Sequence, residues 1–102
     1  MYIEFRTSKL EKYYREQRER ERVWGKVVAR KYVEAVNLLK AVDHPSDLSA
    51  FSQFEYEQLR EDRKGEHALK LGYRERLIFT VRKGSDALIA RIKEVSITHY
   101  DH

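Results

Sequence analysis

The chain has 102 residues, of which 37% are charged and 12% aromatic, and its formal net charge is +4. This length suits one folding unit, so we expect a single domain over residues 1–102. The absence of cysteine excludes disulfides, thiolate metal sites and cysteine nucleophiles. No apolar run approaches the roughly 20 residues of a membrane span, and residues 1–5 do not begin a signal peptide, so we expect a soluble, cytoplasmic protein that binds no membrane. The basic excess favours a polyanionic partner, since cations that neutralise phosphates release counterions.

The first quarter of the chain predicts a short strand followed by a helix. Residues 1–5 are rich in tyrosine, isoleucine and phenylalanine, which favour a strand. Ser8 and Glu11 have the spacing of a capping box, in which each side chain bonds to a free amide at a helix start. We therefore expect a helix from about Lys9 to Arg22, whose charged "REQRERER" end faces water or a partner.

A second, amphipathic helix is predicted from Trp24 onward. Apolar residues recur there at helical spacing along one side: Trp24, Val28, Tyr32, Ala35, Val36, Leu39 and Val42. Pro45 ends this helix because proline lacks an amide hydrogen. Residues 47–54 favour a turn or two of helix, and the polar residues 53–66 predict a surface connection.

The last third of the chain has the period of strands. "HALKL" and "ALIARIKEV" alternate, whereas "RLIFTV" is nearly continuous and apolar, as a middle strand would be. Turn residues fill the gaps at 72–75 and 83–86, which predicts an antiparallel meander. The fold class is therefore α+β, with two N-terminal helices packed on a mainly antiparallel sheet in the order β-α-α-β-β-β.

Cations are dense in this strand region. They are Arg60, Arg63, Lys64, Lys70, Arg74, Arg76, Arg82, Lys83, Arg91 and Lys93. Alternation turns Lys70, Arg76 and Arg91 away from the helices, which predicts a basic face free of helix. The alternative is that these are ordinary solvated residues paired with the acidic residues Glu66, Glu75 and Glu94.

The C-terminal "SITHYDH" gathers four groups that hold charge or move protons: His99, Tyr100, Asp101 and His102. Imidazole titrates near neutrality and can serve as general acid or base, and tyrosine can donate a hydrogen bond. Residues just after the last strand can fold back across the basic face. The alternative is a frayed terminus without a role.

A metal site is the competing interpretation of these histidines. His99 and His102 are three apart, but only His44 and His67 occur elsewhere and zinc sites usually have a firmer signature. No Gly-x-Ser-x-Gly turn or glycine-rich phosphate loop is present. We therefore expect neither a metal nor a cofactor.

Three stretches of the chain are distinctive: Leu59 with "DRKG" at 62–65, the "RLIF" strand led by Arg76, and the "EVS" strand that ends in His-Tyr. Through them the sequence resembles the HigB branch of the RelE/ParE superfamily of bacterial toxins. The resemblance extends from "IEFRTSKLEKYY" through "WGKVVARKYVEAVNLLK" to the C-terminus. The order of elements predicted above is also the order that this family's fold would have.

The resemblance implies a ribosome-dependent mRNA endonuclease, silenced by a HigA-like helix-turn-helix antitoxin. Such toxins cut mRNA on the ribosome without a metal, through attack by the RNA's own 2′-hydroxyl. Arg76 then matches a phosphate-contacting arginine, and His99, Tyr100, Asp101 and His102 are candidate acid, base and orienter. Further substrate-binding candidates are Arg63, Lys64, Lys70, Arg74 and Arg91.

One loop departs from the family pattern. The family often has His-Pro-Leu-x-Gly-Asp-Arg-x-Gly, whereas this chain has Glu57, Gln58 and Glu61 in place of the histidine, the proline and the first glycine. Three explanations stay open: the C-terminal histidines compensate, Glu57 acts as the base, or the protein cleaves poorly.

Two other functions compete with the nuclease. One is a ParE-like toxin that inhibits DNA gyrase through protein contacts, and the other is a non-catalytic RNA-binding module with a disordered tail. The acidic partner segment of an antitoxin would be attracted by the "RERER" residues or by the basic sheet face.

Overall fold

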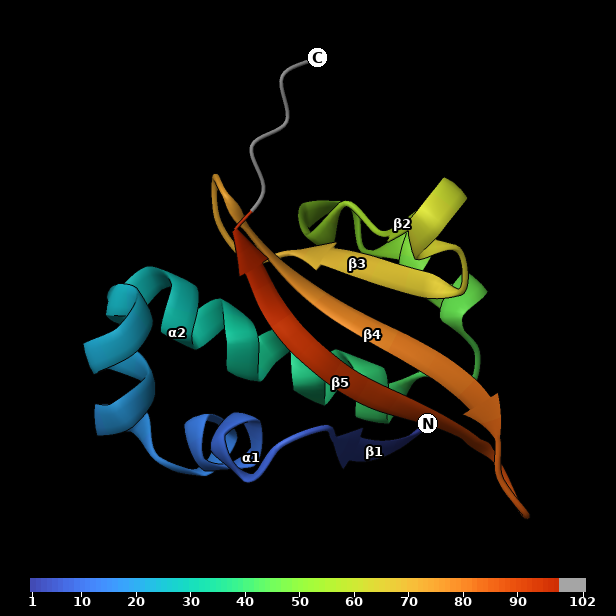
Figure 1. Cartoon of the computed structure of the whole chain (residues 1–102), viewed down its shortest axis with the longest axis horizontal. Helices are drawn as coiled ribbons and strands as arrows, with labels where there is room; N and C mark the ends of the chain where they lie inside the picture. Colours follow the sequence, from blue (N-terminus) through green and yellow to red (C-terminus); the bar gives the residue numbers. More distant parts are fainter. Residues whose placement is uncertain (98–102) are drawn as a thin grey trace.

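The structure is a computed structural model and describes residues 1–97 (Figure 1). The helical elements are α1 (Ser8–Arg15), α2 (Gln17–Ala41) and the short 3-10 helices η1 (Pro45–Ala50), η2 (Ser52–Phe54) and η3 (Glu61–Arg63). The strands are β1 (Tyr2–Phe5), β2 (Glu57–Gln58), β3 (Glu66–Lys70), β4 (Glu75–Lys83) and β5 (Leu88–Ile97). The predicted α+β class and the order of its main elements are confirmed.

The five strands form one sheet in the order β1-β5-β4-β3-β2. β1 is parallel to β5 and the other pairs are antiparallel, so β3, β4 and β5 make the predicted meander with β4 in its middle. The helical turns predicted over residues 47–54 are present as parts of η1 and η2, but the prediction of a surface connection over residues 53–66 is wrong, because this segment also contains β2 and η3. β2 has two exposed polar residues, so no hydrophobic alternation marks it in the sequence.

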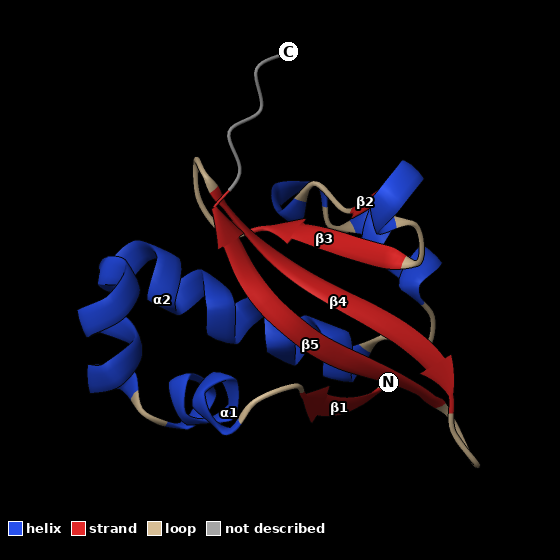
Figure 2. Ribbon diagram, viewed as in Figure 1, coloured by secondary structure: helices blue, strands red, loops and turns tan. Residues whose placement is uncertain are grey.

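Both α-helices cover one face of the sheet, with α2 behind β4 and β5 in the view of Figure 2. The predicted stripe supplies the buried residues Tyr32, Ala35, Val36 and Leu39, which are fully inaccessible. They pack with inaccessible sheet residues that point to the same side, Leu69, Leu77, Phe79 and Ile92. Hence the opposite face, called the open face below, carries no α-helix.

The first helix ends at Arg15 and not at Arg22, which corrects the sequence prediction. Glu16 is extended, with φ −119° and ψ 106°. The Arg20 guanidinium donates to the carbonyls of Tyr13 and Tyr14, at 3.2 Å each, and so satisfies groups that a helix end leaves free. The N-cap is Thr7 and not Ser8, since the Thr7 hydroxyl accepts from the Leu10 amide at 3.2 Å.

Gly25 interrupts α2, and Figure 1 shows the helix changing direction in its first half. Its φ of 78° and ψ of 169° are non-helical and lie in a region that only glycine adopts readily. The bend brings the Trp24 ring against Tyr13 and Tyr32, with ring centroids 4.8 Å apart in both pairs. The Gly25 bend therefore fixes how the first part of α2 packs on α1.

Replacing Gly25 tests this bend. No atom lies within 4 Å of a β-carbon placed at Gly25, so Gly25→Ala introduces backbone strain without a clash. We expect Gly25→Ala to lower the free energy of unfolding by about 1–3 kcal/mol, measured by urea denaturation. The neighbouring exposed change Lys26→Ala is the control and should cost less than about 0.5 kcal/mol. Equal midpoints for the two variants would contradict the role given to Gly25.

Candidate functional site

The open face is lined by the residues that alternate with the core. In β4, Leu77 and Phe79 point to the helices, so Arg76 and Thr80 point to the open face. Lys70 and Arg91 lie on the same face, because they pair with Arg76 and Thr80 across the sheet. The three cations expected to point away from the helices therefore do so.

A β-bulge in β5 adds one more charge to the open face. The register shifts between Ile78, which pairs with Glu94, and Phe79, which pairs with Ile92. The extra residue is Lys93, and its Nζ lies 3.5 Å from a Glu66 carboxylate oxygen on the open face. Bulges commonly redirect a side chain in this way.

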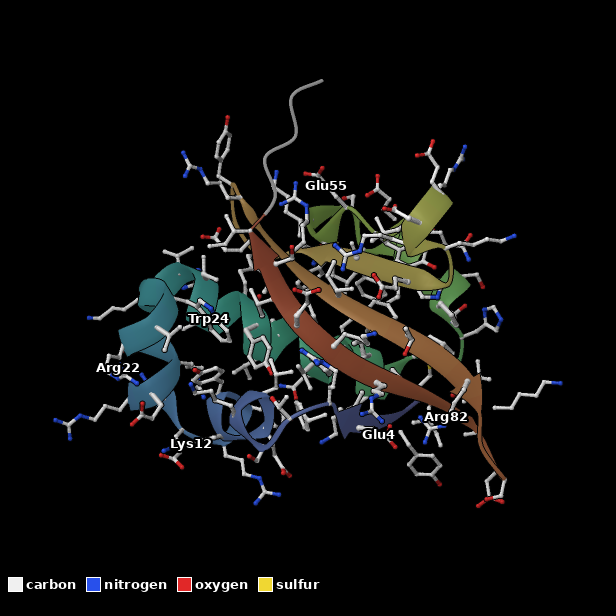
Figure 3. The ribbon with its side chains drawn as sticks, in the orientation of Figure 1. Glu4, Lys12, Arg22, Trp24, Glu55 and Arg82 are labelled. Carbon is white, nitrogen blue, oxygen red and sulfur yellow. The ribbon has the colours of Figure 1, made fainter. Side chains whose placement is uncertain are left out.

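At one end of the open face, Glu4 binds two arginines. Its carboxylate accepts hydrogen bonds from Arg82 at 2.7 and 2.9 Å and from Arg91 at 2.8 Å. The hydrogen bonds from Arg82 and Arg91 lower the pKa of Glu4 to about 2. Figure 3 shows Glu4 and Arg82 together there, with Glu55 at the other end of the sheet. Arg91, expected to bind substrate, is thus an ion-pair partner of β1.

In the middle of the open face, Arg63 ties the η3 segment to the sheet. Its guanidinium donates to Glu66 at 2.7 Å and to Glu94 at 2.9 Å, which joins β3 to β5 across β4. The bridge passes the paired residues Ala68 and Ile78, each only 1% exposed. Arg63, also expected to bind substrate, is held in this bridge. This agrees with the alternative prediction that cations of the strand region pair with Glu66 and Glu94.

The remaining end of the open face carries two cations directly opposite each other. Lys70 pairs with Arg76, and Arg76 pairs with Ser96 on the next strand. Like charges at directly opposite positions destabilise a sheet unless an anion lies between them or beside them. The Glu55 carboxylate accepts from Lys70 at 2.9 Å, which lowers the pKa of Glu55. Arg76 donates to two backbone carbonyls, those of Gly72 and Glu75, at 3.1 Å each.

Glu57 completes this end of the open face. It pairs with Ala68 across the β2–β3 ladder and therefore shares the face of Ala68 and Lys70. We call the set Glu55, Glu57, Lys70, Arg76 and Ser96 the basic corner. Its two carboxylates lie on the same face as its two cations, Lys70 and Arg76.

The other predicted site residues are Arg74, Lys64 and the four C-terminal groups. Arg74 is exposed in the β3–β4 hairpin next to the basic corner. Lys64 is exposed after η3, at the opposite end of β3. His99, Tyr100, Asp101 and His102 lie outside the described residues. Ile97, the last described residue, pairs with Glu75 next to Arg76. The structure thus gathers Lys70, Arg74 and Arg76, and separates them from Lys64 and Arg91.

Of the other members of the basic corner, Glu57 was predicted only as an alternative base, and Glu55 and Ser96 were not predicted as site residues. Glu57 has a sequence signal, since it stands where the resembled family has a loop histidine. Glu55 has none, because its position depends on a left-handed turn with φ 43° that ends η2 and directs the chain toward Lys70.

A second cluster lies on the helix side of β3. The His67 ring stacks on Tyr56 and Phe79, with centroids 5.8 and 5.0 Å away, and its Nδ1 is 2.8 Å from the Tyr56 hydroxyl. It borders an open groove of about 910 Å³ formed largely by residues 56–61 and 64–67. His67 is 7% exposed, and burial lowers its pKa. This cluster anchors β2, the strand that carries Glu57.

Within residues 1–97, no three histidine, aspartate or glutamate side chains converge as metal ligands would. None of the helices in that part of the chain is long and apolar enough to cross a bilayer.

The comparison with known proteins rests on structure, since no family model and no curated protein matches the sequence. A YoeB/ParE toxin from Agrobacterium tumefaciens aligns over 97% of this chain and all of its own, with a TM-score of 0.57 and 16% identity. The fold is that of the RelE/YoeB toxins. YoeB of the YoeB–YefM complex from Staphylococcus aureus aligns over 98% of both chains, with a TM-score of 0.56 and 21% identity.

A YoeB dimer from Staphylococcus aureus also matches, over 98% of both chains, with a TM-score of 0.56 and 18% identity. These structures are described as YoeB and ParE toxins; at these identities they show a shared fold and do not confirm the HigB branch. In this RelE/YoeB fold the basic corner lies at the C-terminal end of β5.

The burial of His67 predicts how stability depends on pH. Burial lowers the pKa of His67 in the folded protein below the value of 6.5 that the ring has in the unfolded chain. The unfolded state therefore binds more protons as pH falls through 6.5, and the free energy of unfolding decreases. We expect His67→Phe to flatten this decrease between pH 7 and pH 5 in urea titrations. Glu4 does not contribute in that window, because its carboxylate changes charge only at lower pH.

The exposed His44 provides the matched control. His44→Gln should keep the same fall in stability between pH 7 and pH 5. A fall that survives in His67→Phe would contradict the assignment to His67.

Proposed function

We propose that this protein is the toxin of a type II toxin-antitoxin system and a ribosome-dependent mRNA endonuclease that works without a metal. The observation that supports this most is the basic corner, where Lys70 and Arg76 face each other on the open face. Two cations side by side on neighbouring strands can bind one phosphate together, and the Glu55 carboxylate balances Lys70 when no RNA is bound. The RelE/YoeB fold supports the same proposal.

The proposed reaction is cleavage of one RNA phosphodiester bond. The 2′-oxygen forms a bond to phosphorus and the bond from phosphorus to the 5′-oxygen breaks, which leaves a cyclic phosphate and a 5′-hydroxyl. A base takes the 2′-hydroxyl proton and an acid gives a proton to the 5′-oxygen. Arg76 and Lys70 stabilise the negative charge on the phosphoryl oxygens, the role in which fixed donors contribute most.

The acid and base are proposed to come from His99, Tyr100, Asp101 and His102, with Glu57 as the alternative base. An extended chain advances at most about 3.6 Å per residue, so Tyr100 is within about 11 Å of Ile97. Three neighbouring strands at about 4.8 Å spacing make the basic corner about 10 Å wide between Lys70 and Ser96. These lengths allow the C-terminal groups to reach a phosphate held at the corner.

The proposed partners are the ribosome with its mRNA and a cognate antitoxin. A YoeB relative was solved in complex with YefM, which supports an antitoxin here. The sequence resemblance favours a HigA-like helix-turn-helix antitoxin, and a neighbouring gene for such a protein would support that type. An acidic antitoxin segment over the basic corner would block RNA directly.

Gyrase inhibition is the second candidate, because one structural relative is described as YoeB/ParE. Expression in cells separates the two functions. Codon-periodic cuts in translated messages support the nuclease, and DNA damage without such cuts supports gyrase inhibition. If the protein binds RNA but causes neither effect, the result supports the non-catalytic RNA-binding module.

Arginine substitutions test the basic corner. We expect Arg76→Ala to lower the rate of mRNA cleavage on purified ribosomes about 10²–10³-fold, the usual cost of removing one charge-stabilising donor. Arg91→Ala is the matched control, since Arg91 also lies on the open face but pairs with Glu4, and it should stay within a few-fold of the original rate. Similar losses in both variants would contradict a localised phosphate site.

The identity of the base is tested by a pH profile. The double variant His99→Ala, His102→Ala is expected to abolish codon-periodic cuts in mapped mRNA ends. If a histidine is the base, Glu57→Gln keeps the fall in rate towards low pH, whereas if Glu57 is the base, Glu57→Gln removes that fall. The control Glu61→Gln changes an exposed carboxylate in the same loop and should leave the rate unaltered. Cleavage that survives the double substitution would contradict the C-terminal assignment.

A further inference from the structure

Tyr73 is the most exposed large hydrophobic side chain within residues 1–97. It is 90% exposed, compared with 59% for Tyr2, the next tyrosine in this respect. It lies in the turn between β3 and β4 and takes no part in the core. A side chain of this kind contributes nothing to folding through burial, so the structure offers its ring to another molecule.

The turn holds Tyr73 in a defined place. The amides of Leu71 and Gly72 donate to the Glu75 carbonyl at 3.0 and 3.4 Å. Gly72 packs so closely that a β-carbon there would lie 2.6 Å from the Glu75 carboxylate and 2.9 Å from Val28. Because the turn is already ordered, little conformational entropy is lost when its exposed ring binds a ligand.

The position of Tyr73 connects it to the basic corner. The turn joins Lys70 and Arg76, which are paired with each other, so Tyr73 is three residues from each cation. Arg74 follows it and is also exposed. A single-stranded nucleic acid whose phosphate lies between Lys70 and Arg76 therefore extends past the Tyr73 ring with its next nucleotide.

We propose that Tyr73 is a stacking platform for a nucleobase next to the phosphate held at the basic corner. Single-stranded RNA is commonly bound by stacking its bases on aromatic side chains while cations hold its backbone. The ring provides the contact and its hydroxyl is dispensable, because stacking uses the π face. This inference rests on the proposed RNA cleavage and assigns the contact that orients the substrate there.

The test uses the full chain on ribosomes with an mRNA that cannot be cut, because its 2′-hydroxyl at the cleavage site is replaced by hydrogen. 2-Aminopurine at each flanking position reports stacking through its fluorescence. We expect quenching at one position with the original protein and with Tyr73→Phe, and its loss with Tyr73→Ala. Base stacking predicts that Tyr73→Ala weakens binding about 5- to 150-fold.

Matched controls make the test specific. Tyr2→Ala removes an exposed tyrosine at the opposite end of the sheet, where Tyr2 pairs with Ile89, and should change neither fluorescence nor binding. Thermal melting should be unchanged in Tyr73→Ala, because the ring is exposed. A Tyr73→Phe protein that behaves like Tyr73→Ala would overturn stacking in favour of a hydroxyl contact.

The Arg76→Ala variant separates this inference from the proposed function. If Arg76→Ala stops cleavage of ordinary mRNA while Tyr73→Ala alters neither binding nor fluorescence, the stacking platform is wrong and the nuclease stands. If the original protein cuts no mRNA on ribosomes, the proposed function fails, and with it the role given to Tyr73.

Discussion

The packing of α2 against one face of the sheet is the constraint on which the functional surface depends. Tyr32 and Leu39 are fully buried between helix and sheet, where they pack with residues of β3, β4 and β5 such as Leu77. Because side chains alternate along a strand, the same packing sends Lys70 and Arg76 to the other side. The hydrophobic core and the charged face are two results of one pattern.

Charges on the open face are distributed unevenly, and this distribution locates the candidate site. At one end Glu4 holds two arginines, and in the middle Arg63 spans two carboxylates. Those groups have carboxylate partners within the described fold. At the basic corner Lys70 and Arg76 lie directly opposite each other, and Lys70 also binds the Glu55 carboxylate. We propose the anion site there because two cations from neighbouring strands lie side by side on the open face.

Two irregular segments serve the basic corner from its sides. The left-handed turn at Glu55 and the short strand β2 bring carboxylates to it, and the stacked His67 holds that strand in place. The hairpin that joins β3 to β4 carries Tyr73 beyond it. A phosphate, its ribose and a neighbouring base would thus meet different elements of the fold, a common way for a small domain to orient a flexible substrate.

Local periodicity in the sequence was enough to predict the α2 stripe, the three strands of the meander and the side on which Lys70, Arg76 and Arg91 lie. Those features follow from 3.6- and 2-residue repeats, which neighbouring residues specify. The break at Glu16, the strand β2 and the partners of Arg63 and Arg91 required the tertiary structure. The break at Glu16 is capped by the nearby Arg20 guanidinium, whose contacts a helical periodicity does not predict. The partners of Arg63 and Arg91, such as the Glu4 carboxylate, are distant in sequence, and only strand register brings them within hydrogen-bonding distance.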